Sequence, residues 1–537
     1  MIAPTHLDER LAAEWRRVGA WTDELVSQLL DQQDPMATAI VEGSRRMSFG
    51  ALTSAAKRLA VRFANDGIRA GDVISMQLPN WWEAVVVSHA AFRIGAVLNP
   101  LLPALRARDL DFIFAEARPT AVVVPGTFRS TDHLDRIASL DNAPGLIYGV
   151  RTSKSAIRSL DRDLAGGPVG GPSVVAPTWT ADDPCLLLYT SGTSSAPKGV
   201  LHTHNTLLAE TRGLAQAHLM SDADVVLLPM PVTHVGGMVY GVLMPAVVGL
   251  RCVFLDVWDP ARAIELLADE AVTVQIGMPV FLRGLLDDPS FHPGAGKAMR
   301  LFSMGGTRVT PADVDEAAKQ LGCWCKRSYG LTEVPTLTTG PATDEDHRAC
   351  TDGLPIGPSR VRIVDPEGTL VPADTAGEIL CQAPEVFVGY LTAELNAEAF
   401  TADGWFRTGD VGILCSHGFL SVTGRIKDII IRGGENISPK EVEDLLIQHP
   451  DVQEAAVVAM PDRVYGERAC AFVQSDATLT LEDVTSFLRA HGVASYKLPE
   501  RLERRSDLPR NTTGKLRKDL LRAEIAAMLE HEAGTSA

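Results

Sequence analysis

The chain has 537 residues, far more than one hydrophobic core usually supports, and its 46% hydrophobic and 22% charged residues are typical of a globular protein. Asp and Glu outnumber Lys and Arg by 67 to 50, and the net charge of −17 argues against binding a nucleic acid through a basic surface. The eight cysteines show no zinc-ligand spacing and are too sparse for a disulfide framework, so we expect reduced thiols in a cytoplasmic protein.

Two segments bear on secretion and on membranes. The first 15 residues carry charges where a signal peptide needs an apolar core, which disfavours secretion. The stretch Val225–Leu250 has no Asp, Glu, Lys or Arg and is long enough to span a bilayer. Three prolines and a histidine interrupt it, so we expect a strand, a loop and a buried helix rather than a transmembrane segment.

From about Ala39 to Gly330, short aliphatic runs alternate with amphipathic stretches, which predicts an α/β fold of parallel sheets covered by helices. Strands are expected at Val73–Leu78, Ala121–Val124, Cys185–Tyr189, Arg251–Leu255, Val272–Ile276 and Leu301–Met304. Helices are expected at Asn80–Ile94 and Pro311–Leu321, the second with Thr310 as N-cap.

The remainder of the chain predicts a change of architecture. The glycine- and proline-rich segment Ala165–Pro172 reads as a surface linker between two similar halves. Short strands and turns, at Val361–Val364, Gly377–Cys381 and Gly418–Val422, indicate a small β-rich subdomain over about 341–424. After Gly424 a charged α+β pattern with its own apolar runs, Ala455–Met460 and Ala469–Val473, predicts a second domain. We therefore expect domains over 1–424 and 425–537.

The segment Tyr189–Val200, Y-T-S-G-T-S-S-A-P-K-G-V, is the most informative in the chain. It follows an expected strand and precedes an expected helix near His204, a context in which loops bind phosphate. Hydroxyl groups, a glycine and Lys198 suit a polyphosphate. The loop is not a Walker A motif, which would need glycine in place of Pro197 and Ser or Thr in place of Gly199. By itself the loop could equally be an ordinary turn.

Together with six further motifs, this loop resembles the adenylate-forming superfamily, which includes acyl-CoA synthetases, non-ribosomal adenylation domains and firefly-type luciferases. The motifs follow in order: Pro229–Gly237, Tyr329–Glu333 (Y-G-L-T-E), Thr408–Asp410 (T-G-D), Gly424–Asp428 (G-R-I-K-D), Arg432–Ile437 (R-G-G-E-N-I) and Pro509–Lys515 (P-R-N-T-T-G-K). The resemblance covers nearly the whole chain. One departure is Ser195, where the family usually has glycine.

The resemblance implies a site for Mg·ATP. Thr332 would bind the α-phosphate and Glu333 would bind Mg²⁺ through a hard oxygen. The remaining nucleotide contacts would come from Thr190, Ser191, Gly192, Thr193, Ser194 and Lys198 on the phosphates, Gly305, Gly306 and Thr307 as a wall of the pocket, Tyr329 and Gly330 at the adenine, and Asp410 and Arg425 at the ribose. A capped turn would explain Tyr329–Glu333 equally well without the other motifs.

The resemblance also implies that the second domain moves. Lys515 would catalyse adenylation by bridging carboxylate and α-phosphate oxygens, and Lys427 would be the hinge. Coenzyme A would then meet Gly433, Gly434, Glu435 and, with less support, Lys497. An isolated lysine near a C-terminus would otherwise be solvated.

The acyl group would lie near His234, which gates the path between carboxylate and thiol, and near Gly237, Met238 and Gly241. A lone histidine in an apolar run is more often a core residue. The aliphatic segments Gly236–Gly241 and Gly277–Leu282 favour an apolar acid, and the closest resemblance is to short- or medium-chain and cyclohexanecarboxylate CoA ligases, with arylalkanoic acids still open. A carrier-protein thiol or an amine is the alternative acceptor, a silent nucleotide-binding protein is the rival from another class, and a homodimer stays open.

Overall fold

The computed structural model describes residues 3–153, 158–166, 178–190, 197–292, 294–344, 347–511 and 515–535. These residues form two compact units. The first comprises the chain to Ser191, Pro197–Val361 and Cys381–Phe406, and the second comprises Arg362–Leu380 and Arg407–Ala537. The expected boundary at Gly424 remains a prediction about domains, because compactness alone does not establish which part of the chain moves.

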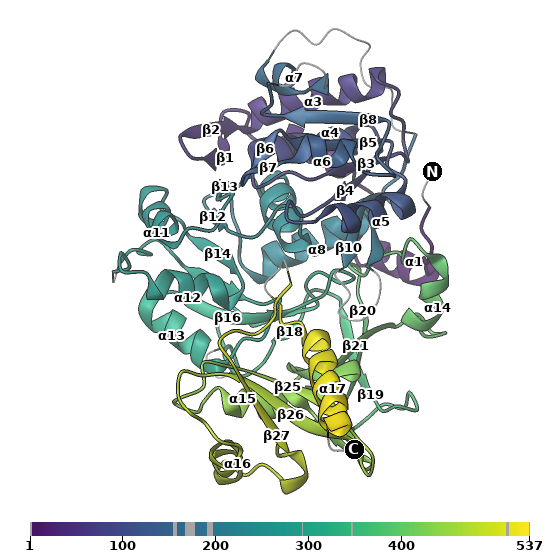
Figure 1. Ribbon diagram of the computed structural model, residues 1–537. Helices are drawn as coiled ribbons and strands as arrows, with labels where there is room; N and C mark the ends of the chain where they lie inside the picture. The colour runs from purple at the N-terminus through teal and green to yellow at the C-terminus, as the bar shows by residue number, and fades with distance from the viewer. Residues whose placement is uncertain are drawn as a thin grey trace. The chain divides into compact units, whose positions relative to one another are not determined.

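A nine-stranded sheet forms one half of the first unit (Figure 1). Its central strands β16, β15, β14, β12, β13 and β1 are parallel neighbours, whereas β2, β17 and β18 pair antiparallel at the two edges. In sheet order the strands are β18 (Leu354–Pro355), β17 (Thr338–Thr339), β16 (Trp324–Tyr329), β15 (Leu301–Met304), β14 (Val274–Gly277), β12 (Val225–Leu228), β13 (Arg251–Phe254), β1 (Thr38–Glu42) and β2 (Arg45–Ser48).

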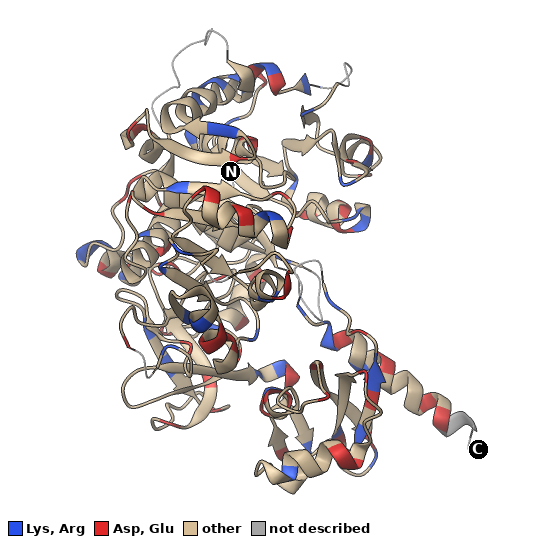
Figure 2. Cartoon of the chain, turned by 90° about the vertical axis from the view of Figure 1, so that its left-hand side faces the viewer, with Lys and Arg blue, Asp and Glu red and all other residues tan. Residues whose placement is uncertain are grey.

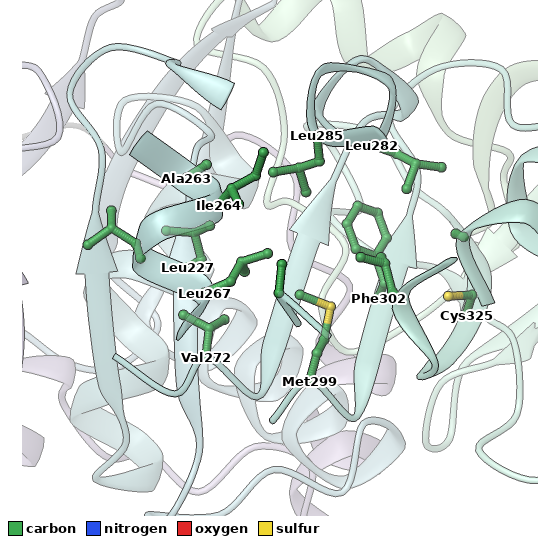
Figure 3. Close-up of a cluster of buried hydrophobic side chains, with 14 of the residues drawn as sticks. Leu227, Ala263, Ile264, Leu267, Val272, Leu282, Leu285, Met299, Phe302 and Cys325 are labelled. Carbon is green, nitrogen blue, oxygen red and sulfur yellow. The ribbon is translucent and has the colours of Figure 1, made fainter. Parts of the chain in front are cut away.

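Three helices cover one face of this sheet through a shared apolar cluster, shown in Figure 3. They are α11 (Pro260–Asp269), α12 (Pro279–Asp287) and α13 (Pro311–Leu321). Each begins with proline at its first turn, where the missing N–H costs nothing. Thr310 caps α13 as predicted and accepts a hydrogen bond from the Asp313 N–H.

A seven-stranded sheet forms the other half of the first unit. Its order is β11 (Lys198–Thr203), β10 (Pro184–Thr190), β4 (Val97–Pro100), β3 (Val73–Met76), β5 (Ala121–Pro125), β8 (Leu146–Val150) and β9 (Arg158–Ser159), and only β11 runs antiparallel to its neighbour. The helices α5 (Ala107–Ala117) and α6 (His133–Ala138) pack against one face, while α3 (Phe49–Asn65) packs against α4 (Trp82–Arg93).

The apolar stretch Val225–Leu250 folds as predicted into a strand, a loop and buried helical turns. After β12 it forms α9 (Val235–Met238), a π-helical turn at Val239–Leu243 and α10 (Met244–Val248). Within the part of the chain that the structure describes, no helix has both the length and the apolar character needed to cross a membrane. The predicted linker falls almost entirely outside the described residues.

The second unit is built on two smaller sheets. Most of a four-stranded sheet belongs to it, with β19 (Arg360–Val364), β20 (Ala376–Gln382), β21 (Phe406–Leu414) and β22 (Leu420–Arg425). The five-stranded sheet contains β24 (Glu435–Ile437), β23 (Ile430–Arg432), β26 (Gly466–Gln474), β25 (Glu454–Asp462) and β27 (Arg501–Arg505). The helices α15 (Pro439–Leu446) and α16 (Leu481–Ala490) share one apolar cluster with this sheet, and α17 (Lys518–Thr535) shares another.

Acidic and basic side chains are interspersed along the elements visible in Figure 2. Some short strands, among them β2, β11 and β16, carry Lys or Arg without Asp or Glu. The absence of a basic stripe for a phosphate backbone stays a prediction from the sequence.

Candidate nucleotide and magnesium site

The parallel strands of the nine-stranded sheet gather three of the predicted motifs at one edge. Because β16, β15, β14 and β12 are parallel neighbours, their carboxyl ends lie side by side. Tyr329–Glu333 follows β16, Gly305–Thr307 follows β15, and Pro229–Gly237 follows β12. The carboxyl edge is where open α/β sheets bind their ligands.

Close backbone packing explains two of the predicted glycines at this edge. A Cβ at Gly330 would lie 2.0 Å from the carbonyl oxygen of Pro335, and one at Gly305 would lie 2.5 Å from that of Ser328. Any larger residue would force these turns apart. Tyr329 is buried, whereas Gly306 and Thr307 are exposed beside β15.

The structure corrects the predicted context of the phosphate loop. The predicted helix does begin at His204, as α8 (His204–Ala217), but the loop does not lead straight into it, because the strand β11 lies between them. Thr190 and Lys198 face each other across the antiparallel pair β10–β11. The sequence argument failed because the short run after Lys198 has no hydrophobic alternation strong enough to reveal a strand. Ser191, Gly192, Thr193 and Ser194 lie outside the described residues.

The strand β11 directs two side chains toward the Tyr329–Glu333 motif. Lys198 and His202 lie four positions apart and therefore on the same face of the strand. The Nε2 of His202 lies 2.8 Å from the carbonyl oxygen of Thr332. A carbonyl oxygen only accepts, so Nε2 carries the proton and the imidazole donates to Thr332. Burial lowers the pKa of His202 to about 4, which keeps the ring neutral at pH 7.

A second link joins Lys198 to Glu333 through Tyr390. The Lys198 Nζ lies 4.9 Å from the centroid of the Tyr390 ring, within range of a cation–π contact. The Tyr390 hydroxyl donates to Glu333 Oε1 at 2.8 Å, and the Phe387 N–H donates to the Glu333 carbonyl oxygen at 2.8 Å. The predicted phosphate-binding lysine and the predicted metal-binding carboxylate are therefore held together in the first unit.

The chemistry of Glu333 suits Mg²⁺. A carboxylate offers two hard oxygens with about four acceptor positions, so the hydrogen bond from Tyr390 leaves the group chemically able to bind a cation. Among the described residues no group of three or more His, Cys, Asp or Glu side chains could hold a metal ion. One carboxylate together with substrate phosphates is the usual way in which enzymes bind Mg²⁺ for phosphate chemistry.

The predicted acyl-pocket residues lie on α9 and the π-helical turn. His234 is the N-cap of α9, where its Nδ1 accepts from the Gly236 N–H at 3.3 Å. Met238 is completely buried. A Cβ at Gly237 would lie 1.9 Å from the Pro231 carbonyl oxygen, so packing alone requires that glycine. At Gly241, the position of the missing side chain faces apolar side chains of β12 and β13. The acyl pocket remains a prediction.

In the second unit, Asp410 and Arg425 form a cross-strand ion pair. They are register partners on β21 and β22, and Arg425 Nε lies 3.0 Å from Asp410 Oδ1. The Asp410 side chain is almost fully buried, while that of Arg425 is 39% exposed. An Arg–carboxylate pair of this kind explains both residues structurally, and binding of ribose by Asp410 remains a prediction.

The predicted hinge and coenzyme A residues also have local structural roles. Gly433 and Gly434 form the two-residue turn between β23 and β24 with φ of +58° and +94°, and a two-residue hairpin of this handedness needs positive φ at both positions. Glu435 pairs with Arg432 in that hairpin. The Lys497 ammonium contacts both carboxylate oxygens of Glu441 at 2.8 Å. Lys427 accepts a hydrogen bond from Arg522 at its carbonyl oxygen.

Lys515 lies in a loop that is closed at its base. Its N–H donates to Asn511 Oδ1, and its carbonyl oxygen accepts from the Asn511 N–H, both at 2.9 Å. Arg510 and Leu516 form an antiparallel bridge beside it. The loop therefore fixes the backbone of Lys515 within the second unit, and its catalytic role remains a prediction.

His202 and Tyr390 are two residues that the sequence did not indicate. Tyr390 lies 57 positions beyond Glu333 in V-G-Y-L, with nothing in its neighbourhood to mark it. The spacing of Lys198 and His202 would have placed both on one face, had the strand been recognised.

Two domain families match the chain. A model described as "AMP-binding enzyme" matches residues 29–391, and one described as "AMP-binding enzyme C-terminal domain" matches residues 441–515. These matches, with the α/β fold and the ordered motifs, define an adenylate-forming enzyme.

Two sequence relatives and one solved structure indicate which kind of adenylate-forming enzyme the chain is. The medium-chain fatty-acid–CoA ligase of Escherichia coli (strain K12) is 35% identical over 98% of this chain and 94% of its own length. The 2-hydroxy-7-methoxy-5-methyl-1-naphthoate–CoA ligase of Streptomyces carzinostaticus is 34% identical over 97% and 96%. The crystal structure of ATP-bound MatB from Rhodopseudomonas palustris superposes with a TM-score of 0.85 at 29% identity, covering 94% of this chain and 99% of that one. The chain belongs to the AMP-binding enzyme family and is an AMP-forming acid–thiol ligase.

Proposed function

We propose that this protein is an ATP-dependent carboxylate–CoA ligase for an apolar acid. It converts the acid to an acyl-adenylate with release of pyrophosphate and then transfers the acyl group to coenzyme A. The acid is a short- or medium-chain, alicyclic or arylalkanoic acid. The enzyme works in the cytoplasm and participates in fatty acid metabolism.

The observation that carries this proposal is the connected set Lys198, Tyr390 and Glu333, with Thr332 held by His202. A cation for a polyphosphate and a carboxylate for Mg²⁺ both contact one tyrosine, with Lys198 on β11 and Glu333 in the turn after the carboxyl end of β16. That arrangement suits a nucleoside triphosphate with its metal better than any neutral ligand.

Adenylation brings two anions together, because a carboxylate oxygen attacks the α-phosphorus while the bond to the β-phosphate breaks. When bound, Mg²⁺ would neutralise part of the phosphate charge. Lys198 and the hydroxyl groups of Thr190, Ser191, Thr193 and Ser194 would bind the β- and γ-phosphates, while Thr332 would contact the α-phosphate. The ammonium of Lys515 would stabilise the charge that develops between the reacting carboxylate and phosphate.

Other residues would orient the nucleotide and the thiol. Gly305, Gly306 and Thr307 would line the nucleotide pocket, with Tyr329 against the adenine and Asp410 binding the ribose hydroxyls with help from Arg425. We propose that residues 425–537 act as the mobile domain, with Lys427 as its hinge. In the second step Gly433, Gly434 and Glu435 would pass the pantetheine arm, and Lys497 would meet coenzyme A phosphates on release from Glu441.

The apolar segments 236–241 and 277–282 support an acid without a polar tail. Gly277, Phe281 and Leu282 are buried at the end of β14 and the start of α12. His234 would gate the approach of the thiol to the acyl carbonyl.

The test is a panel of carboxylic acids incubated with ATP and Mg²⁺ while pyrophosphate release is measured. Each active acid is then assayed with free coenzyme A, a pantetheinylated carrier protein and a simple amine, and the products are identified by mass spectrometry. We expect acyl-CoA from an apolar monocarboxylate. Formation of acyl-carrier protein or amide alone would mean that the acceptor is a carrier thiol or an amine instead of coenzyme A. The absence of acid-dependent pyrophosphate release would refute the proposed reaction.

A further inference from the structure

Tyr390 is placed by main-chain pairing rather than by its own side chain. Val388 donates to the Leu201 carbonyl oxygen at 2.9 Å and Leu391 donates to that of Gly199 at 2.7 Å, so this segment extends the sheet beside β11. Val200 and Tyr390 form an antiparallel bridge. Two main-chain hydrogen bonds on either side of the bridge fix where the Tyr390 ring lies.

The Tyr390 side chain contacts two functional groups by two chemically different parts. Its ring face meets the Lys198 ammonium, and its hydroxyl donates to Glu333 Oε1. The side chain is only 5% exposed, and the Phe387 ring packs edge-on against it at 4.8 Å between centroids. Because the ring is buried and packs against Phe387, it has little freedom to move away from Lys198 or Glu333.

The hydrogen bond favours one orientation of the Glu333 carboxylate. A phenol donates to a carboxylate only while the carboxylate is ionised or its accepting oxygen is unprotonated, and charge-assisted bonds of this kind are among the stronger ones in proteins. The phenol is the donor of this pair, because an unprotonated carboxylate oxygen can only accept. Glu333 is thus held in one orientation by a side chain that also contacts Lys198.

We propose that Tyr390 is a positioning residue that sets Glu333 for Mg²⁺ and Lys198 for the β- and γ-phosphates of the same nucleotide. This inference rests on the proposed function, because it takes Glu333 as the metal-binding carboxylate. It predicts that the hydroxyl of Tyr390 controls how ATP binding depends on Mg²⁺. The ring of Tyr390 instead controls how much Lys198 contributes to ATP binding.

The chain offers a matched control. Tyr148 is fully buried in β8 of the same unit, and its hydroxyl donates to Asp66 Oδ2 at 2.7 Å. Tyr148→Phe removes a tyrosine–carboxylate hydrogen bond from a different part of the protein. Any general loss of stability from removing such a bond should appear in both Tyr148→Phe and Tyr390→Phe. An effect on the Mg²⁺ dependence of ATP binding should appear only in Tyr390→Phe.

The experiment measures binding of a fluorescent ATP analogue by the whole protein, in the absence of acid, across a series of Mg²⁺ concentrations. We expect Tyr390→Phe to raise the Mg²⁺ concentration for half-maximal binding about tenfold, the loss of one charge-assisted hydrogen bond, and to leave Mg²⁺-free binding unchanged. Tyr390→Leu should also weaken Mg²⁺-free binding, because the ring is gone. Tyr148→Phe should match the wild type in both measurements.

A second variant keeps the proposal testable if Tyr390→Phe does not fold. Glu333→Gln preserves an acceptor oxygen of the same shape, and it should shift the Mg²⁺ dependence at least as far. Where both single variants fold, the double variant should shift the Mg²⁺ dependence no further than Glu333→Gln alone.

The outcomes separate the two proposals. Wild-type Mg²⁺ dependence in both Tyr390→Phe and Tyr390→Leu, with lower melting temperatures only, would show that Tyr390 is a packing residue and overturn the inference. Failure of the wild type to bind Mg·ATP would instead refute the proposed function.

Discussion

Lys198 is positioned by strand pairing and by its contact with an aromatic ring. It is the register partner of Thr190 on β10 and lies against Tyr390. A lysine that is placed in this way contributes a point charge whose location the backbone defines. Its removal should therefore affect the nucleotide more than the fold.

We expect Lys198→Ala to raise the KM for ATP about 10- to 100-fold, the range for losing a hydrogen-bonded charge on a phosphate. Lys198→Arg should recover part of this loss because it restores the charge. Steady-state kinetics with varied ATP measures the effect, and Lys297→Ala, at an exposed position, is the control. An unchanged KM for ATP in Lys198→Ala would contradict the assignment.

Two buried glutamates, Glu210 in α8 and Glu385 in the segment after β20, give a prediction at the same scale. Burial raises the pKa of Glu385 to about 8, and Ser359 donates to its two carboxylate oxygens at 2.9 and 3.2 Å. Glu210 is also buried and its pKa is raised by burial and then by Glu385. From pH 4.5 to pH 8 the folded protein retains a proton on Glu385 that the unfolded chain releases, so stability falls as pH rises through this window.

Glu385→Gln should remove that loss. We expect the melting temperature of the variant, measured relative to the wild type, to be higher at pH 8.5 than at pH 5 by about 4 °C or more. Differential scanning fluorimetry at the two pH values measures it, with the exposed Glu394→Gln as control. An equal difference at both pH values would mean that Glu385 is ionised in the folded protein.

At the scale of elements, β11 is the strand that connects the phosphate loop to the Tyr329–Glu333 motif. Its half-buried first residue is Lys198, and its buried part carries His202, which donates to Thr332. The Nδ1 of the same ring lies 3.2 Å from the Thr206 hydroxyl at the start of α8. The strand thus joins the first turn of α8 and the Tyr329–Glu333 turn through a single neutral imidazole.

His202→Leu should leave the Thr332 carbonyl oxygen without this donor. We expect the free energy of unfolding to fall by about 1–3 kcal/mol and kcat for adenylation to fall with it. His202→Gln, which can place an amide N–H near the former Nε2, should recover more kcat than stability. Urea unfolding and pyrophosphate release measure the two effects, and equal kcat in the Leu and Gln variants would argue that Thr332 needs no donor.

The elements also show how far the sequence could be interpreted. Strands such as Leu301–Met304 and the capped helix Pro311–Leu321 were predicted with their bounds, because apolar runs and cap residues act locally. β11 was missed, because its pairing with β10 and with residues 388–391 is decided by contacts far apart in the chain. Tyr390 could not be found for the same reason, whereas Glu333 and Lys198 were indicated by ordered motifs.

At the scale of the whole molecule, the predicted reaction depends on residues of two compact units. Lys198, Thr332 and Glu333 belong to the first, while Asp410, Arg425 and Lys515 belong to the second. The second unit has its own apolar clusters on both faces of its five-stranded sheet. Each unit therefore has a hydrophobic core of its own to hold the predicted site residues that it contains.

We expect Lys515→Ala to reduce ATP–pyrophosphate exchange about 100-fold or more while leaving the transfer of a supplied acyl-adenylate to coenzyme A largely intact. The two half-reactions are measured separately. Arg489→Ala, an exposed substitution in the same unit, serves as the control. Equal losses in both half-reactions would point to damage of the fold instead of a role confined to adenylation.

The antiparallel pairing of β10 with β11 has a practical consequence for engineering. The ladder hydrogen bonds anchor Thr190 and Lys198, so the short connection between them can be exchanged as a cassette without re-registering either strand. Libraries that vary only its composition, including glycine in place of Ser195, would test how the loop sequence affects binding of the nucleotide phosphates on an unaltered scaffold. An insertion of one residue into β11 after Lys198 would instead turn Lys198 to the opposite face relative to the rest of the strand, and it should raise the KM for ATP as Lys198→Ala does.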